Sequence, residues 1–347
     1  MKLAIVLFNL GGPDSPEAIE PFLRNLFSDP AVLTMPGFIR KPLARFIAKK
    51  RAPIAREIYA KIGGRSPIVE QTQAQVEALQ QAISEHDTRA FIAMRCWKPF
   101  TQDAAAAVAA FQPDAIVLLP LYPQYSTTTT GSSLAEWKRV AEAFGITAPT
   151  TTICCYPDLD GFIAAEAALI QEAMVGARSD LSYRLLLSAH GLPKRVIAKG
   201  DPYQTQVERT AAAIVARLSW QDSLVSYQSR VGPVEWIGPA TDDEIRRAGA
   251  EGKGVVIAPI AFVSEHSETL VELDIEYGML AREAGVPDYR RVPTVGTHPD
   301  FIAGLAGLVV VLSGSKIGNR PAKLPCRSAA VGTLSRNVWP WCMRKPS

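Results

Sequence analysis

The chain has 347 residues, of which 48% are hydrophobic and 20% are charged, and its formal net charge is +3. This length is enough for two domains of ordinary size, and the composition is typical of a globular protein with a full core. The small net charge, without a run of more than three Lys or Arg residues, argues against a nucleic-acid partner.

The apolar segments of the chain predict no membrane-spanning helix. The N-terminal run MKLAIVLFNLGG is too short for a secretion signal, so we interpret it as a first strand. The longest other apolar stretch, Phe301 to Leu312, falls short of the roughly 18 residues that a spanning helix needs. The cysteines lack a CxxC pair and favour thiols over disulfides. They are Cys96, Cys154, Cys155, Cys326 and Cys342. We therefore expect a cytoplasmic protein.

The first half of the chain alternates predicted strands and helices. Strands are predicted at residues 3–10, 90–95, 115–120 and 150–155, and helices at 16–27, 67–84, 102–111 and 134–143. Residues 31–52, which we call the basic-apolar lip, mix Phe, Ile and Leu side chains with Arg and Lys. This segment is the candidate for contact with a membrane or an anionic amphiphile, or it is a surface helix with a solvated basic face.

The second half repeats the plan. Strands are predicted at residues 184–189, 223–229, 254–260 and 289–292, and helices at 159–174, 204–218, 241–250 and 268–284. Such alternation predicts parallel sheets covered on both faces, and hence two similar doubly wound α/β domains with a cleft between them. We place the domains at residues 1–155 and 156–297, followed by a closing helix at 298–312 and a loosely ordered tail at 313–347.

The motif LLLSAHGLP places His190 directly after an apolar strand. The carboxyl ends of parallel strands are where open α/β sheets bind their ligands, and Gly191 follows as part of a turn that would hold the ring at this edge. The alternative is a core histidine whose hydrogen bonds are satisfied.

A second polar cluster follows another predicted strand, in the sequence APIAFVSEHSETLVELDIEY. It contains Glu265, His266 and Glu268 at a helix N-terminus, where capping by Ser264 or Ser267 would explain part of it. Beyond Glu268, two further carboxylates follow at i+4 and i+8 on one helix face. They are Glu272 and Glu276. Their alternative is a solvated face.

Several common site types are absent from the sequence. No GxGxxG or GxxxxGK[ST] follows a predicted strand, no GxSxG surrounds a serine, and HExxH does not occur. What remains is an open site of imidazole and carboxylate, which suits proton transfer near neutral pH and brief binding of a metal ion that is passed on.

Motifs along nearly the whole chain resemble those of the ferrochelatase family. They are NLGGP at 9–13, IGGRSPI at 62–68, MRCW at 94–97, YPQYSTTTTGS at 122–132, LLLSAHGLP at 185–193, SYQSRVGPVEWIGPATDDEI at 226–245 and FVSEHSETLVELDIEY at 262–277. The resemblance implies two four-stranded, Rossmann-like domains around a porphyrin cleft. It also implies insertion of Fe²⁺ into protoporphyrin IX with release of two protons, the last step of haem synthesis.

The same resemblance implies roles for individual residues. His190 and Glu268 match the catalytic pair, and together with Glu272 and Glu276 they match the groups that handle the metal. Further positions match the family's porphyrin-binding or supporting residues. These are Asn9, Leu10, Arg51, Tyr59, Ser66, Arg95, Trp236, Phe262 and His266.

The partners implied are protoporphyrin IX and ferrous iron as substrates, without an organic cofactor. Some family members carry a [2Fe–2S] cluster on four cysteines, but here the tail holds only Cys326 and Cys342, so we expect no cluster. The alternatives are an enzyme that uses coproporphyrin III, a non-catalytic porphyrin or metal carrier, and a shorter-chain cobalt or nickel chelatase. The last lacks the SYQSRVGP and YPQYS stretches. The basic-apolar lip suggests peripheral contact with the inner face of the membrane.

Overall fold

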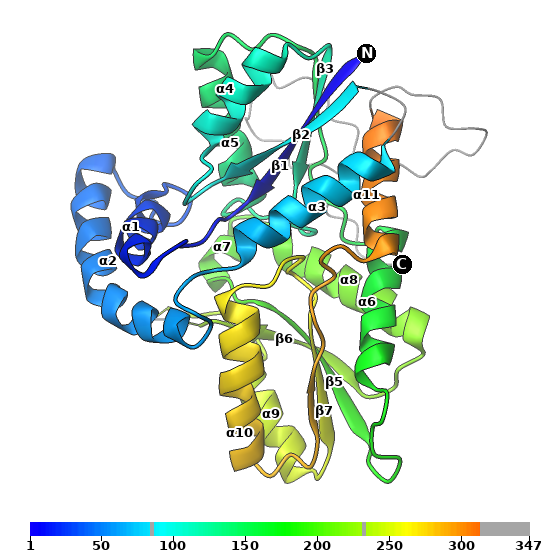
Figure 1. Cartoon of the computed structure of the whole chain (residues 1–347). Helices are drawn as coiled ribbons and strands as arrows, with labels where there is room; N and C mark the ends of the chain where they lie inside the picture. The colour runs from blue at the N-terminus through cyan, green and yellow to red at the C-terminus, as the bar shows by residue number, and fades with distance from the viewer. Residues whose placement is uncertain (84–86, 231–233, 313–347) are drawn as a thin grey trace. The chain divides into compact units, whose positions relative to one another are not determined.

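The computed structural model describes residues 1–83, 87–230 and 234–312 of the chain (Figure 1). These residues form two compact units. The first unit begins at Met1 and ends at Cys155, and the second begins at Tyr156 and ends at Gly304. From Leu305 onward the last helix clusters with the first unit.

The first unit is built around a parallel four-stranded sheet with the strand order β2-β1-β3-β4. Its strands are β1 (Lys2–Asn9), β2 (Asp87–Met94), β3 (Ala115–Pro120) and β4 (Thr150–Thr152). Its helices are the short η1 (Pro16–Ala18), α1 (Ile19–Ser28), α2 (Gly37–Ala60), α3 (Ile68–Ala82), α4 (Thr101–Phe111) and α5 (Thr130–Ala143).

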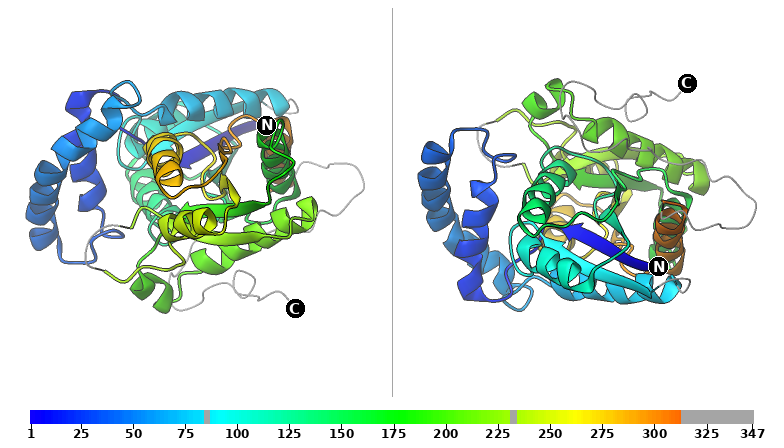
Figure 2. Two further views of the ribbon diagram at one scale, coloured as in Figure 1. Left: turned by 90° about the horizontal axis from the view of Figure 1, so that it is seen from below. Right: turned by 90° about the horizontal axis from the view of Figure 1, so that it is seen from above.

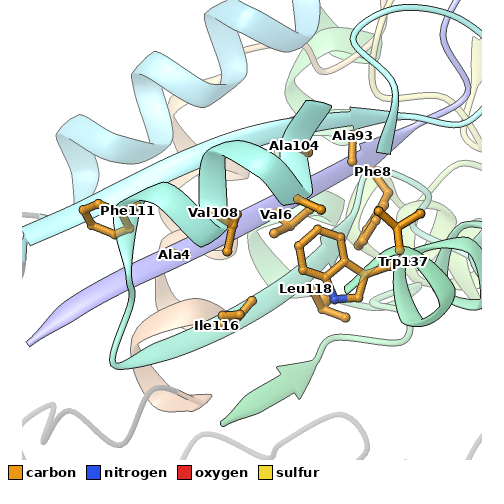
Figure 3. Packing of buried hydrophobic residues seen from close by; sticks show 12 residues of the cluster. Ala4, Val6, Phe8, Ala93, Ala104, Val108, Phe111, Ile116, Leu118 and Trp137 are labelled. Atoms are coloured by element: carbon orange, nitrogen blue, oxygen red, sulfur yellow. The ribbon is translucent and has the colours of Figure 1, made fainter. Parts of the chain in front are cut away.

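One face of this sheet is covered by α4 and α5, and Figure 3 shows the packing. Alternate residues of β1 point to opposite faces of the sheet. Ala4, Val6 and Phe8 therefore project to the same side, where the ring of Phe8 meets Trp137 of α5 edge to face. Helix α3 lies on the opposite face in Figure 1. Both faces are thus covered, which explains why β1 is apolar at nearly every position.

Helices α1 and α2 pack side by side, as Figure 2 shows in two directions. Small residues of α2 (Ala48 and Ala52) are buried against Ile19 and Phe22 of α1. By contrast, Phe38 of α2 is 79% exposed and Phe46 is 57% exposed, so the outer side of α2 presents apolar rings to solvent beside exposed Lys and Arg side chains.

The second unit has a parallel four-stranded sheet of the order β6-β5-β7-β8. Its strands are β5 (Tyr183–His190), β6 (Ser223–Gln228), β7 (Gly254–Pro259) and β8 (Tyr289–Arg291). Its helices are α6 (Asp160–Ala173), α7 (Lys194–Ala198), α8 (Tyr203–Leu218), α9 (Thr241–Ala250), the π-helix η2 (Glu268–Glu276) and α10 (Tyr277–Glu283), and α11 (Pro299–Leu312) begins in this unit.

The core of the second unit lies between the sheet and the segment that carries the acidic residues. Leu273 of η2 is fully buried against Leu186 of β5 and Ile257 of β7. Ala281 of α10 is buried in the same cluster. The packing of these apolar side chains fixes η2 on the sheet and thereby fixes the position of the polar residues on its other side.

The predicted fold class is confirmed: each unit is a doubly wound α/β layer with four parallel strands. Several helices differ from the sequence prediction. Helix α5 begins at Thr130 rather than Leu134, α7 was not predicted, and the predicted helix 268–284 is a π-helix followed by a short α-helix. The tail at 313–347 lies outside the described residues.

Candidate active site

His190 lies at the carboxyl end of β5, the strand that pairs with both β6 and β7. The strand is fully buried until its last residue, because Leu185, Leu186 and Leu187 pack into the core. The chain then turns at Gly191, where a Cβ atom would lie only 2.9 Å from the carbonyl oxygen of Gln228. Only glycine fits this close approach to β6. The imidazole is therefore held where the buried strand reaches the edge of the sheet.

His190 and Glu268 form a hydrogen-bonded pair, with 2.8 Å between Nδ1 and Oε2. Burial by itself would lower the pKa of His190, but the carboxylate raises it above the ordinary histidine value. The two side chains remain 38% and 27% exposed, so a substrate can reach them. The alternative of a satisfied core histidine is therefore wrong: the ring is at the surface of its unit and is oriented by a carboxylate.

Glu268 is the first residue of η2, in which hydrogen bonds join residues five apart. At its end, the N–H of Tyr277 donates to the carbonyl of Glu272. Thr269, Val271 and Leu273 are its buried side chains. π-Helical turns are rare and occur frequently at functional sites. This segment combines a buried apolar side with carboxylates beside the histidine.

Glu272 accepts several hydrogen bonds, so it does not lie on a solvated face. Its Oε1 accepts from the backbone N–H of Ser229 at 2.8 Å and from the hydroxyl of Tyr277 at 3.0 Å. Its Oε2 lies against the Ser229 hydroxyl and 3.5 Å from the amide of Gln228. Burial and the neighbouring charge of Glu268 nevertheless raise the pKa of Glu272. Glu276, at the end of η2, is half-buried.

Two aromatic side chains accompany this pair. The ring of His266 is buried, and its centroid is 4.5 Å from that of Phe262. His266 Nε2 is 4.0 Å from Oε1 of Glu268. Burial lowers the pKa of His266, which favours its neutral form. His266 thus places a buried imidazole beside the carboxylate that is hydrogen-bonded to His190.

Trp236 lies near the same turn, on the segment that leads to α9. A Cβ atom at Gly191 would lie 3.4 Å from its ring, and Trp236 pairs with Pro193 through an isolated β-bridge. The second unit therefore gathers His190, Glu268, Phe262 and His266 at one edge, with Trp236 beside the turn that follows His190.

In the first unit, Asn9 is the last residue of β1 and is buried. Its side-chain oxygen accepts from the N–H of Leu10 at 2.8 Å, and its Nδ2 donates to Thr72 Oγ1 at 3.1 Å. Leu10 packs with Tyr59 and Cys96 in the cluster between β1, α1 and α2. The structure thus brings Asn9, Leu10 and Tyr59 together at one end of the sheet.

The other expected substrate residues of this unit are spread more widely. Ser66 is buried and lines a hollow of about 510 Å³ together with Phe100. A Cβ atom at Gly12 would lie 2.5 Å from the Ser66 hydroxyl oxygen, so the NLGGP loop packs tightly on this serine. Arg51 is an exposed residue of α2.

Arg95 lines a second hollow of about 290 Å³ and belongs to a polar network. Its guanidinium is 3.0 Å from the Asp29 carboxylate and donates to Ser132 Oγ at 2.7 Å. Ser132 in turn donates to Asp29. Asp29 is only 4% exposed, so the network holds α1, β2 and α5 together as well as presenting a cation.

Sequence analysis did not identify Ser229, Tyr277 or Asp29. The first two complete the hydrogen bonds of Glu272, and the third pairs with Arg95. Ser229 stands inside the quoted motif SYQSRVGP and is the last residue of the predicted strand 223–229, so its position at a sheet edge was a usable signal. For Asp29 no such signal exists, because its partners are distant in sequence.

Three structural tests bear on metals, cysteines and membranes. No group of three or more His, Cys, Asp or Glu side chains is arranged to hold a metal ion among residues 1–83, 87–230 and 234–312. Cys154 and Cys155 are thiols with sulfur atoms 3.5 Å apart, whereas Cys326 and Cys342 lie outside these ranges. Of the helices described, none is long and apolar enough to cross a membrane.

Comparisons with known proteins agree on one family. The profile of the ferrochelatase family matches residues 2–311. The ferrochelatase of Caulobacter vibrioides is 53% identical over 345 residues, which cover 95% of this chain and 99% of that protein. The ferrochelatase of Phenylobacterium zucineum is 55% identical over 311 residues, which cover 88% of this chain and 90% of that one.

Solved structures resemble the fold. SirB from Bacillus subtilis, determined with Fe³⁺, matches with a TM-score of 0.52 at 13% identity, over 88% of this chain and 94% of that chain. The sirohydrochlorin chelatase SirB from B. subtilis subspecies spizizenii, in complex with cobalt, also gives a TM-score of 0.52, at 10% identity. At these identities the likeness concerns the arrangement of the elements alone.

Proposed function

This chain belongs to the ferrochelatase family, and we propose that His190 and Glu268 remove the pyrrole protons and receive ferrous iron as it enters the porphyrin. The protein is an enzyme that inserts iron into a porphyrin in haem biosynthesis. We propose protoporphyrin IX as the porphyrin. The hydrogen bond between His190 Nδ1 and Glu268 Oε2, at 2.8 Å, is the observation that supports these roles best.

The geometry of this bond leaves the other ring nitrogen for the substrate. Donation from Nδ1–H to the carboxylate fixes the tautomer, so that Nε2 carries the lone pair. Two pyrrole N–H protons must leave as the metal enters, and an imidazole base with a pKa near the operating pH is suited to take them. The raised pKa of His190 increases its basicity, and Glu268 stabilises the imidazolium that forms.

The metal-handling groups are proposed to be His190, Glu268, Glu272 and Glu276. His190 Nε2 and the oxygens of Glu268 supply nitrogen and oxygen ligands, which suit a divalent ion of borderline hardness. An arrangement with few protein ligands binds such an ion weakly, which favours its transfer to four porphyrin nitrogens. The positions of Glu272 and Glu276 farther along η2 support a path by which iron or protons pass.

For the porphyrin, we propose an apolar wall with a cation at its rim. In the second unit, Phe262, His266 and Trp236 offer the flat rings that a macrocycle needs. In the first unit, Leu10 and Tyr59 are proposed separately as apolar substrate-binding residues. Arg51 and Ser66 would meet the propionates. Arg95, which is paired with Asp29, and Asn9, which bonds the loop that follows β1, are proposed as pocket or support residues. Arg51→Ala is expected to raise the KM for porphyrin without changing kcat.

The decisive test is anaerobic insertion of Fe²⁺ by the parent chain, His190→Ala and Glu268→Gln. We expect turnover of protoporphyrin IX by the parent, loss of turnover in both variants, and unchanged porphyrin binding measured by fluorescence quenching. Full activity in Glu268→Gln would refute the role of that carboxylate.

The same assay separates the alternative functions. Turnover of coproporphyrin III alone would keep the mechanism and change the substrate. Tight binding of both porphyrins without metal insertion would make the protein a carrier on a chelatase fold. The carrier result is not expected, because the exposure of the His190–Glu268 pair favours a group that reacts with a substrate.

We further propose that the basic-apolar lip contacts an anionic membrane surface, so that the cytoplasmic enzyme docks on the inner face of the membrane. Phe38, Ile39 and Phe46 are 79%, 48% and 57% exposed, and Lys41, Arg45, Lys49 and Lys50 lie on the same helix. Apolar anchors beside cations are typical of interfacial helices. Flotation with anionic liposomes, lost when these three residues become Ser, is the expected result.

On cofactors, we propose that iron is a substrate only, with no organic cofactor and no [2Fe–2S] cluster. Support comes from the sequence, which places only two cysteines in the tail where some relatives concentrate three. Iron and acid-labile sulfide are expected to be absent from protein purified anaerobically. Equal, stoichiometric amounts of both would contradict this proposal.

A further inference from the structure

Ser229 follows β6 directly and has an unusual backbone. His190 pairs with Gln228 in the sheet, so Ser229 stands at the same edge, one residue beyond the partner of the catalytic histidine. Its φ is +60°, in the left-handed region that residues other than glycine seldom occupy. Gln112 and Ser219 also have a positive φ, but both end helices, where this conformation is common. Ser229 ends a strand.

The side chain of Ser229 is shared between two carboxylates. Its Oγ is 3.0 Å from Oε2 of Glu268 and within hydrogen-bonding distance of Oε2 of Glu272. Its backbone N–H donates to Oε1 of Glu272 at 2.8 Å. One residue thus contacts three carboxylate oxygens, and one of these also receives the bond from His190.

The left-handed conformation explains how one residue makes all these contacts. It turns the N–H and the side chain of Ser229 toward η2, whereas in a continuing strand successive groups would point in opposite directions. Strained backbone conformations persist where the surrounding contacts require them, and they cluster at functional sites. Here the contacts that require it are those to Glu268 and Glu272.

We propose that Ser229 is a positioning residue of the enzyme. It fastens Glu272 to the end of β6 and holds the Glu268 carboxylate where it meets His190 Nδ1. The inference rests on the proposed roles of His190 and Glu268. In this arrangement Glu272 is first an anchor of η2, because Ser229, Tyr277 and Gln228 together surround its two oxygens.

Ser229→Gly tests the hydroxyl without straining the chain, since glycine adopts a positive φ freely and retains the N–H. We expect kcat for iron insertion to fall by about 10- to 100-fold, the usual effect of losing a partner that orients a metal-site ligand. The KM for porphyrin is expected to remain unchanged, because Ser229 acts on the carboxylate and not on the macrocycle.

The chain offers a matched control in Ser219→Gly. Ser219 has a φ of +53°, ends α8, and is exposed. The same substitution there removes a hydroxyl in the same backbone conformation but far along the chain from the carboxylates, so parental kcat and KM are expected. Ser229→Asn is a rescue variant, because asparagine tolerates this conformation and its amide donates to a carboxylate. We expect it to recover part of kcat.

Two results would overturn the proposal: parental kcat in Ser229→Gly, or a loss of kcat that is matched by Ser219→Gly. A separate measurement is independent of turnover. In a double-mutant cycle of Ser229→Gly with Glu272→Gln, the free energies of unfolding are expected to be non-additive. If the parent chain inserts no iron, the proposed function fails, while the cycle still decides whether Ser229 holds Glu272; additive free energies would refute the contact.

Discussion

The two sheets have the same strand order, yet their carboxyl edges differ in chemistry. In each unit the chain builds a central strand, β1 or β5, with the next strand on one side and the third and fourth on the other. The central strand of the first unit ends at Asn9, and that of the second ends at His190. Equivalent positions therefore carry a neutral amide in one unit and a titratable imidazole in the other.

The residues around these two positions follow the same division. The Asn9 amide is buried, and both of its polar atoms are hydrogen-bonded within the first unit. Its oxygen accepts from the N–H of Leu10, and its nitrogen donates to Thr72. Among the residues that the structure describes, the His190 ring is hydrogen-bonded to Glu268 through Nδ1 alone, and it is partly exposed. A common α/β scaffold thus sets where a side chain stands, while the segment after the third strand decides whether chemistry occurs there.

The largest effect is expected when His190, the last residue of β5, is replaced by Asn, the last residue of β1. His190→Asn retains a polar group that can bond Glu268 but removes the base, so kcat for iron insertion should fall by about 10²- to 10⁴-fold. Circular dichroism and the thermal midpoint should stay near those of the parent, because the ring is partly exposed. Residual activity within tenfold of the parent would show that the two edges do not differ in the way proposed.

The next largest effect is expected when the ion pair between Arg95 and Asp29 in the first unit is removed. Asp29→Ala leaves the Arg95 guanidinium and the Ser132 hydroxyl without their acceptor in a mostly buried place. We expect the free energy of unfolding, measured in urea, to fall by about 2–3 kcal/mol.

A control for this loss is the exposed pair Arg139–Glu136, whose arginine side chain is 60% exposed. Arg139→Ala should cost less than about 1 kcal/mol, as exposed pairs generally do. Equal losses in the two variants would mean that burial of Asp29 does not matter to the fold.

Sequence patterns predicted the regular parts of both units closely. Residues 115–120 and 241–250 have the predicted bounds because apolar runs and helical periodicity depend on near neighbours. Helix α5 was predicted four residues too short, because Thr130 to Ser133 are poor helix formers. In the fold these residues are packed into the helix, and Thr130, Ser132 and Ser133 are buried.

Sequence patterns indicate which residues lie near the ends of strands. They do not indicate which residues distant in the sequence come into contact. The positions of His190 and Glu268 were predicted from the end of β5 and from the segment that follows β7. Ser229 needed the left-handed turn at the end of β6, and no local pattern signals that conformation for a serine. The π-helix was likewise hidden, because Glu268, Glu272 and Glu276 also fit the spacing of an ordinary helix.

Two carboxylates of the second unit, Glu272 and Glu166, differ in their hydrogen bonding. Glu272 is surrounded by donors, whereas both oxygens of the fully buried Glu166 lack a hydrogen-bond partner among the described residues. Burial raises the pKa of Glu166 well above its ordinary value of 4.5. The folded state therefore keeps this proton while the unfolded state has lost it, and folding stability falls as the pH rises above 4.5 toward the folded pKa.

Glu166→Gln removes this dependence. Relative to the parent, the variant should gain stability by up to about 1.4 kcal/mol for each pH unit above the unfolded pKa, until the folded pKa is reached. Urea unfolding at several pH values between 5 and 8 would measure the difference, with roughly equal stability expected at the acidic end. A difference that does not change with pH would show that Glu166 is ionised in the fold.

The smallest effect is expected on the outer side of α2, where apolar side chains are largely exposed. Phe38 and Phe46 are mostly exposed, and the Lys50 ammonium group lies 4.8 Å from the centroid of the Phe46 ring. Surface side chains of this kind contribute little to folding, so Phe38→Ser with Phe46→Ser should change the free energy of unfolding by less than about 0.5 kcal/mol each. Turnover of detergent-solubilised porphyrin should also be unchanged, while recovery on anionic liposomes falls. A large loss of stability would instead mean that these rings pack within the protein, and the membrane proposal would lose its support.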